Sequence, residues 1–96
     1  MNYIKVKWIH SFPDMPVWMY IELDEERWEQ RKVEVFADGH IGYADDESAT
    51  EPTGLGEDPV PSITEISADS QFLPEEITKE EFEIMWSKAL KRVTTD

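Results

Sequence analysis

The spacing of the apolar residues changes once along this chain, from alternation in its first half to steps of three and four near its C-terminal end. Alternation is the period of a strand, and steps of three and four are the period of an amphipathic helix. Tyr3–Ser11 and Val17–Leu23 alternate. The helical spacing is followed by Phe82, Met85, Trp86, Ala89 and Leu90. Strands that come first and helices that come last are typical of the α+β class.

Four strands are expected between about residues 3 and 44. After the two alternating segments, Trp28–Phe36 and His40–Ala44 are rich in β-branched and aromatic residues, which favour strands. The dipeptide Asp38-Gly39 between them is typical of a tight hairpin turn with positive φ. We therefore expect an antiparallel β-meander of about four strands.

Two helices are expected, over about 62–69 and 79–93, and each begins with a capping-box pattern. Ser62 is followed by Glu65, and Thr78 is followed by Glu81, so each hydroxyl and each carboxylate can satisfy a free backbone N–H. We expect both helices to pack on one face of the meander. A chain of 96 residues fits one domain, residues 1–96.

Acidic residues dominate the charge. The chain has 22 Asp and Glu against 9 Lys and Arg, a net charge of −13, and twelve acids without a single Lys or Arg lie between Val33 and Thr78. Nucleic acids and anionic membranes bind Lys and Arg patches, so we expect neither as a partner. A basic protein is the natural complement. The alternative is that the acids only keep the domain in solution.

The connection over residues 45–58 is expected to be an exposed acidic loop. It has no periodicity, and connections of this length are often functional. We expect its carboxylates to contact the basic partner: Asp45, Asp46, Glu47, Glu51, Glu57 and Asp58. A second candidate surface is an aromatic patch formed by Trp18, Tyr20 and Trp28.

No pattern of catalytic or metal-ligating residues stands out. The chain lacks Cys, and its two histidines, His10 and His40, are not spaced as a metal-binding pair. No serine lies in a nucleophile motif. We therefore expect no catalytic residue, no metal and no cofactor, and a protein that is not an enzyme. The sequence leaves open the roles of both histidines and the oligomeric state.

Four segments together carry a resemblance to a known family. They are Tyr3–His10, Glu22–Glu34, Asp38–Ala44 and Glu76–Phe82. In combination they resemble a family of small, single-domain, acidic bacterial proteins of unknown function. The resemblance implies a bacterial, cytoplasmic, stand-alone domain and carries no activity or site residue.

Two function classes follow from these features. The first is an acidic binding protein, such as an immunity or inhibitor protein that neutralises a basic toxin, for example a nuclease. Its rigid acidic face would compete for a cleft that binds a polyanion. The second is a bacterial regulatory or small-ligand-binding module that uses the aromatic patch.

Overall fold

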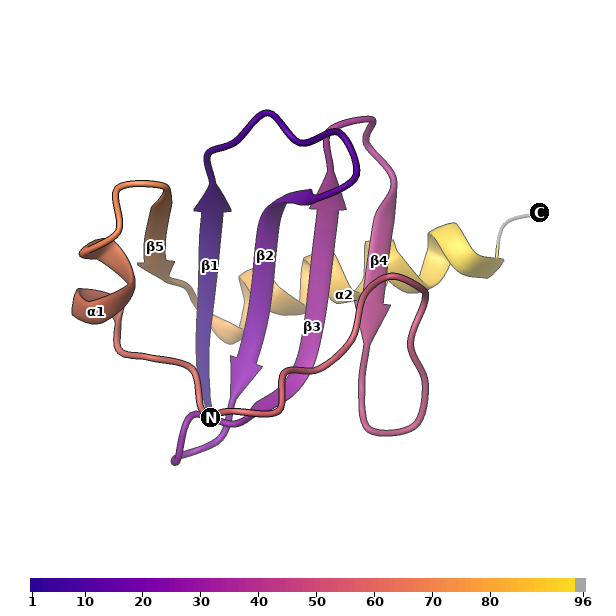
Figure 1. Cartoon of the computed structure of the whole chain (residues 1–96). Helices are drawn as coiled ribbons and strands as arrows, with labels where there is room; N and C mark the ends of the chain where they lie inside the picture. The colour runs from indigo at the N-terminus through magenta and orange to yellow at the C-terminus, as the bar shows by residue number, and fades with distance from the viewer. Residues whose placement is uncertain (95–96) are drawn as a thin grey trace.

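The computed structural model describes residues 1–94 and confirms the α+β class. An antiparallel sheet has the strand order β4-β3-β2-β1-β5, and two helices accompany it (Figure 1). The strands are β1 (Asn2–Trp8), β2 (Pro16–Leu23), β3 (Glu29–Phe36), β4 (Ile41–Ala44) and β5 (Phe72–Glu76). The helices are α1 (Ile63–Ser67) and α2 (Lys79–Thr94). The first four strands form the expected meander.

The turn between β3 and β4 is the hairpin that the sequence predicts. Gly39 has a φ of 93°. This is a left-handed conformation in which glycine has no steric penalty. The N–H of Gly39 donates to the carbonyl of Phe36 at 2.9 Å, and the N–H of Phe36 donates to the carbonyl of His40 at 3.0 Å. The Asp-Gly signal is therefore confirmed as an antiparallel hairpin.

Strand β5 was not expected from the sequence. It follows α1 in the chain and pairs with β1, from Ile4 opposite Glu76 to Trp8 opposite Phe72. Its sequence contains Pro74, which cannot donate to a sheet ladder and is tolerated in a strand at the edge of a sheet. The sheet therefore has five strands. Pro74 interrupts the alternating pattern of β5, so the sequence did not predict this strand.

The two helices lie on opposite faces of the sheet, which corrects the expectation that they share one face. We call the face that carries Ile4, Val6 and Ile21 the front face, and these residues pack with residues of α1. The back face carries Tyr20 and Val33, which pack against α2, the helix behind the sheet in Figure 1. Since β1 and β2 place apolar side chains on both faces, each face needs a cover. Only α2 is C-terminal.

Helix α2 begins with the expected capping box. The Thr78 hydroxyl accepts from the N–H of Glu81 at 3.1 Å, and the Glu81 carboxylate accepts from the N–H of Thr78 at 3.4 Å. Phe82 and Ala89 on its buried stripe are fully enclosed. Leu90, expected on the same stripe, is 39% exposed.

The acidic connection after β4 is anchored rather than fully exposed. The Thr53 hydroxyl, which is buried, donates to the Glu34 carboxylate at 2.8 Å. The N–H of Gly56 donates to Glu29 Oε1 at 2.6 Å, and Lys32 Nζ donates to the carbonyl of Gly54 at 3.2 Å. Polar side chains of β3 thus hold the connection on the front face.

Glycine at position 42 permits this close approach of the connection to β4. A Cβ at Gly42 would collide with the hydroxyl of Thr53, which the connection places directly against the strand. Only a residue without a side chain leaves room for the backbone and the hydroxyl to lie this close.

We expect the buried stripe of α2 to provide much of the stability. Phe82→Ala empties a fully enclosed site in the back-face core. It should lower the free energy of unfolding by about 3–5 kcal/mol, the usual cost of truncating a buried Phe. Denaturant melts measure the change. A loss below about 1 kcal/mol would contradict the packing of α2 on the sheet.

The matched control is Ile84→Ala. Ile84 lies on the same helix and is 57% exposed. Its truncation should cost less than about 0.5 kcal/mol, as is usual for a surface substitution. A similar loss from both variants would show that the effect comes from the helix itself and not from the enclosed core.

Candidate functional site

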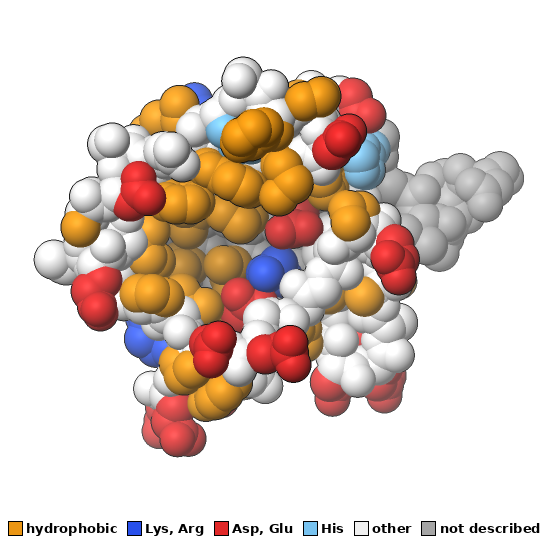
Figure 2. All heavy atoms as spheres, viewed as in Figure 1, with side chains coloured by type: hydrophobic (Ala, Val, Ile, Leu, Met, Phe, Trp, Pro, Cys, Tyr) orange, Lys and Arg blue, Asp and Glu red, His pale blue; other side chains and the backbone are white. Residues whose placement is uncertain are grey.

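The front face has an open hollow between the sheet and α1, with a volume of about 400 Å³ (Figure 2). Its floor is apolar and comes from Val6 of β1 with Met19 and Ile21 of β2. Three further apolar side chains line it, Val60, Ile66 and Phe72. We call this site the front hollow. Its volume is within the range of about 300–1,000 Å³ that is typical of ligand pockets.

Arg27 fixes the wall of the front hollow formed by the segment that leads into α1. Its guanidinium donates to the carbonyls of Val60 and Pro61, each at 2.8 Å, and its own carbonyl accepts from the N–H of Val60 at 2.8 Å. The backbone of Arg27 has a φ of 69°. Positive φ is uncommon for a residue other than glycine. The connection between β2 and β3 therefore positions the wall, and the Ser62–Glu65 capping box then begins α1.

The charged groups of the front hollow are mainly carboxylates. Lys32 is the one Lys or Arg among the described residues that line it, and its Nζ lies 2.9 Å from Glu29 Oε1. Both side chains are largely buried, 12% and 8% exposed. This close ion pair therefore contributes little net charge to the surface. Glu65 and Asp69, on α1 and just after it, are exposed. The hollow thus combines an apolar floor with a negative rim.

A second hollow, of about 390 Å³, lies at the connection between β1 and β2. We call it the Trp8 hollow; it is lined by Trp8, Phe12, Pro13, Asp14 and Met15. Trp8 stacks on Phe72 of the front hollow, with ring centroids 5.7 Å apart. Figure 2 shows hydrophobic side chains continuing from the front hollow to the upper edge, where Figure 1 places this connection. The two hollows therefore belong to one apolar surface.

His10 holds the connection beside the Trp8 hollow. Its Nε2 lies 2.8 Å from the carbonyl oxygen of Pro16, and its Nδ1 lies 2.9 Å from the backbone N of Phe12. A carbonyl only accepts and an N–H only donates, so the neutral ring with its proton on Nε2 satisfies both contacts. The sequence left the role of His10 open, and the structure shows this bridge.

The six acids of the expected partner-binding site are not gathered in one place. Glu57 and Asp58 are exposed and directly precede Pro59–Pro61, the segment that walls the front hollow. The carboxylate of Asp45 accepts from the N–H groups of Glu47 and Ser48, at 2.9 and 2.8 Å, and so shapes the turn after β4. Three others are exposed on the earlier part of the connection, Asp46, Glu47 and Glu51. Of the six acids, only Glu57 and Asp58 adjoin the front hollow.

The expected aromatic patch is divided between two places. Trp18 and Tyr20 stack on the back face, with centroids 6.3 Å apart. The ammonium groups of Lys5 and Lys7 lie 5.5 and 5.8 Å from the Trp18 ring. Trp28 is 39% exposed and lies beyond the opposite end of β2. The structure therefore brings together two of the three residues.

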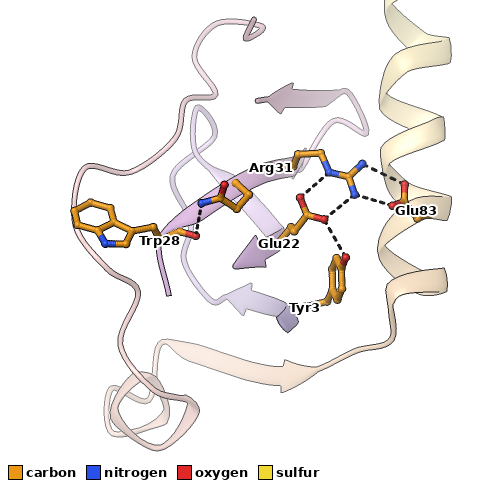
Figure 3. Close-up of polar contacts among 6 residues, drawn as sticks. Tyr3, Glu22, Trp28, Arg31 and Glu83 are labelled. Carbon is orange, nitrogen blue, oxygen red and sulfur yellow. Dashed lines mark hydrogen bonds and ion pairs between the residues drawn. The ribbon is translucent and has the colours of Figure 1, made fainter. Parts of the chain in front are cut away.

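Sequence reasoning missed a network of four titratable groups around Arg31 (Figure 3). The guanidinium donates to the Glu22 carboxylate twice at 2.8 Å and to Glu83 of α2 at 2.6 and 3.2 Å. The Tyr3 hydroxyl donates to Glu22 at 3.0 Å. The Arg31 guanidinium also lies over two rings of α2, with its Cζ 4.9 Å from the centroid of Phe82 and 5.0 Å from that of Trp86.

These contacts shift the pKa values of the network. Hydrogen bonds from Arg31 lower the pKa of both Glu22 and Glu83. The two carboxylates in turn raise the pKa of Arg31, and burial is the main cause that raises the pKa of Tyr3. Since every group has a partner within the network, we assign it a structural role in joining α2 to the sheet.

Two features are absent from the part of the chain that the structure describes: a cluster of metal-ligating side chains and a membrane-spanning helix. Within residues 1–94, no three His, Asp or Glu side chains come together in a group that could hold a metal ion. No described helix is long and apolar enough to span a membrane.

The fold and the front hollow define a small α+β domain whose front face is apolar and has a rim of carboxylates. The chain belongs to the family described as Domain of unknown function (DUF6881), whose model matches residues 2–91. This match confirms the resemblance to a family without an assigned activity. No curated protein and no solved structure matches the chain.

The Arg31 network should make stability depend on pH. Glu22 and Glu83 titrate near 4.5 when unfolded and lower when folded. Their contribution is therefore present above about pH 4.5 and is lost as the pH falls through the folded pKa values. We expect Glu83→Gln to lower the free energy of unfolding by about 1 kcal/mol at pH 7, because its charge-assisted bonds are partly exposed. The difference from the native chain should shrink in melts below pH 4.5.

The matched control is Glu80→Gln, which removes an exposed carboxylate from the first turn of the same helix. It should change the free energy of unfolding by less than about 0.5 kcal/mol at any pH. A Glu83→Gln difference that stayed constant down to pH 3 would show that the Arg31–Glu83 pair does not couple to folding.

Proposed function

We propose that this domain binds a basic protein segment on its front face, and that the front hollow receives an apolar side chain of that segment. The observation that carries the proposal is the coincidence of an open apolar hollow with a rim of carboxylates. An acidic surface that only kept the domain in solution would need no such hollow. The protein acts in this proposal as a binding module, without a catalytic step.

The apolar and acidic parts of the front hollow have different tasks. An apolar side chain that fills a hollow in the middle of an interface contributes most of the binding energy. The carboxylates of Glu65 and Asp69 line the hollow and contribute charge complementarity. Such complementarity raises the association rate and disfavours acidic competitors. Lys32 does not oppose a basic segment, because Glu29 neutralises it at 2.9 Å.

The net charge of the chain supports the same class of partner. The domain carries a net charge of −13 and therefore attracts basic proteins. This attraction extends over about 8 Å at physiological ionic strength. An immunity or inhibitor protein directed at a basic toxin, such as a nuclease, would use a face of this kind. That specific role stays a prediction from the charge of the sequence.

A short peptide of alternating Leu and Lys tests the proposal. In an extended conformation it presents Leu on one side and Lys on the other. We expect it to bind in isothermal titration and to weaken steeply as the salt concentration rises. A peptide in which Gln replaces each Leu has the same charge, and we expect it to bind at least about tenfold more weakly, because it has no apolar anchor.

Two charge-reversed variants separate the front hollow from the acidic connection. The first, Asp58→Lys/Asp69→Lys, changes one carboxylate that lines the front hollow and one that precedes its wall, and we call it the rim variant. The second, Asp46→Lys/Glu47→Lys, makes the same change in net charge away from the hollow. Because long-range attraction falls equally in both, the excess loss in the rim variant reports local contact. We expect the rim variant to bind the Leu-Lys peptide at least about fivefold more weakly than the other. Equal peptide affinities of the two variants would show that the peptide does not contact the front hollow.

A further inference from the structure

We propose that the Trp8 hollow takes a second apolar side chain of the same basic segment, and that a backbone carbonyl of that segment accepts a hydrogen bond from Trp8 Nε1. This inference rests on the proposed function, and it adds a second anchor to it. The occupant is thus an extended segment with two apolar side chains on one side and basic side chains on the other.

The Trp8 hollow is lined by apolar side chains that are exposed to water. Phe12 is 60% exposed and Met15 is 40% exposed, and both line the same hollow. Contiguous exposed apolar side chains of this kind mark interaction sites. Because Trp8 stacks on Phe72, this surface runs without a break into the front hollow.

Trp8 provides the second, independent observation. Its Nε1 is buried and has no hydrogen-bond partner among the described residues. Buried donors of this kind are rare in folded proteins, where nearly all find an acceptor. Since Trp8 lines the hollow, the carbonyl of a bound segment supplies that acceptor once the side chain that covers Nε1 moves aside.

The geometry of an extended chain and the charge beside the two hollows specify the segment. Alternate residues of an extended chain lie about 7 Å apart on the same side. Two apolar side chains on the same side of an extended segment can therefore enter the two hollows, which meet where the Trp8 ring stacks on the Phe72 ring. The charged residue that lines the Trp8 hollow is Asp14, so its rim is acidic like that of the front hollow. A basic segment therefore finds complementary charge along both.

Nuclear magnetic resonance with the alternating Leu-Lys peptide tests the second anchor. The indole N–H signal of Trp8, identified by its absence in Trp8→Phe, should move downfield when the peptide binds, because a new acceptor deshields the proton. The indole signals of Trp18 and Trp86 on the back face should stay in place. The methyl signal of Met19 reports the front hollow separately.

Affinity measurements on two truncated variants complete the test. Phe12→Ala removes a wall of the Trp8 hollow and should weaken peptide binding at least about fivefold. Leu73→Ala is the matched control, because Leu73 is 52% exposed and lies on the back face, opposite Lys7. The affinity of this control should equal that of the native chain.

The outcomes distinguish the two proposals. If Met19 shifts while the Trp8 indole signal and the Phe12→Ala affinity do not change, the second anchor is wrong and the front hollow remains. If the Trp8 signal shifts and Met19 does not, the front hollow is wrong and the segment docks at Trp8 alone. An absence of binding to the native chain overturns both.

Discussion

The guanidinium of Arg31 joins the sheet to α2 across the edge of the back-face core. It forms bonds to Glu22 within the sheet and to Glu83 on α2, and it lies over the ring of Phe82, the enclosed centre of that core. Glu22 is only 7% exposed. Loss of its partner would therefore leave a carboxylate with little access to water, which is strongly destabilising. This pairing therefore helps to position α2 against the sheet, beside the apolar contacts of the back-face core.

On the front face, charged side chains of the sheet hold a loop, whereas on the back face they hold a helix. Glu29, Lys32 and Glu34 of β3 bind the connection that follows β4 through Gly56, Gly54 and Thr53. These bonds hold the connection against β3, while α1 packs beside β5 and β1. The connection and α1 leave a gap between them, and the front hollow lies in this gap above Met19 and Ile21. The front hollow is therefore a consequence of how the sheet is covered.

The proposed binding of a basic segment uses both the charge and the shape of the front face. Carboxylates distributed over a surface raise association rates, yet individually they contribute little to affinity. The apolar floor of the front hollow and the exposed side chains of Phe12 and Met15 can provide that affinity. The acids that adjoin these apolar groups, Asp58 and Asp69 among them, therefore matter more in this proposal than those at Asp46 and Glu47.

Local sequence patterns were enough to predict the class of fold, the four strands of the meander, the Asp38-Gly39 hairpin and the starts of both helices, because periodicity, turn chemistry and capping are local. The same patterns include the acidic charge on which the proposal of a basic partner rests. The packing of the whole domain sets the pairing of Phe72–Glu76 with β1, the placement of the helices on opposite faces and the contact between Arg31 and Glu83. It likewise decided the site, since the front hollow and the Trp8 hollow are formed by residues far apart in the chain, such as Val6 and Ile66. A local pattern contains no information about such distant contacts, which depend on the packing of the whole domain.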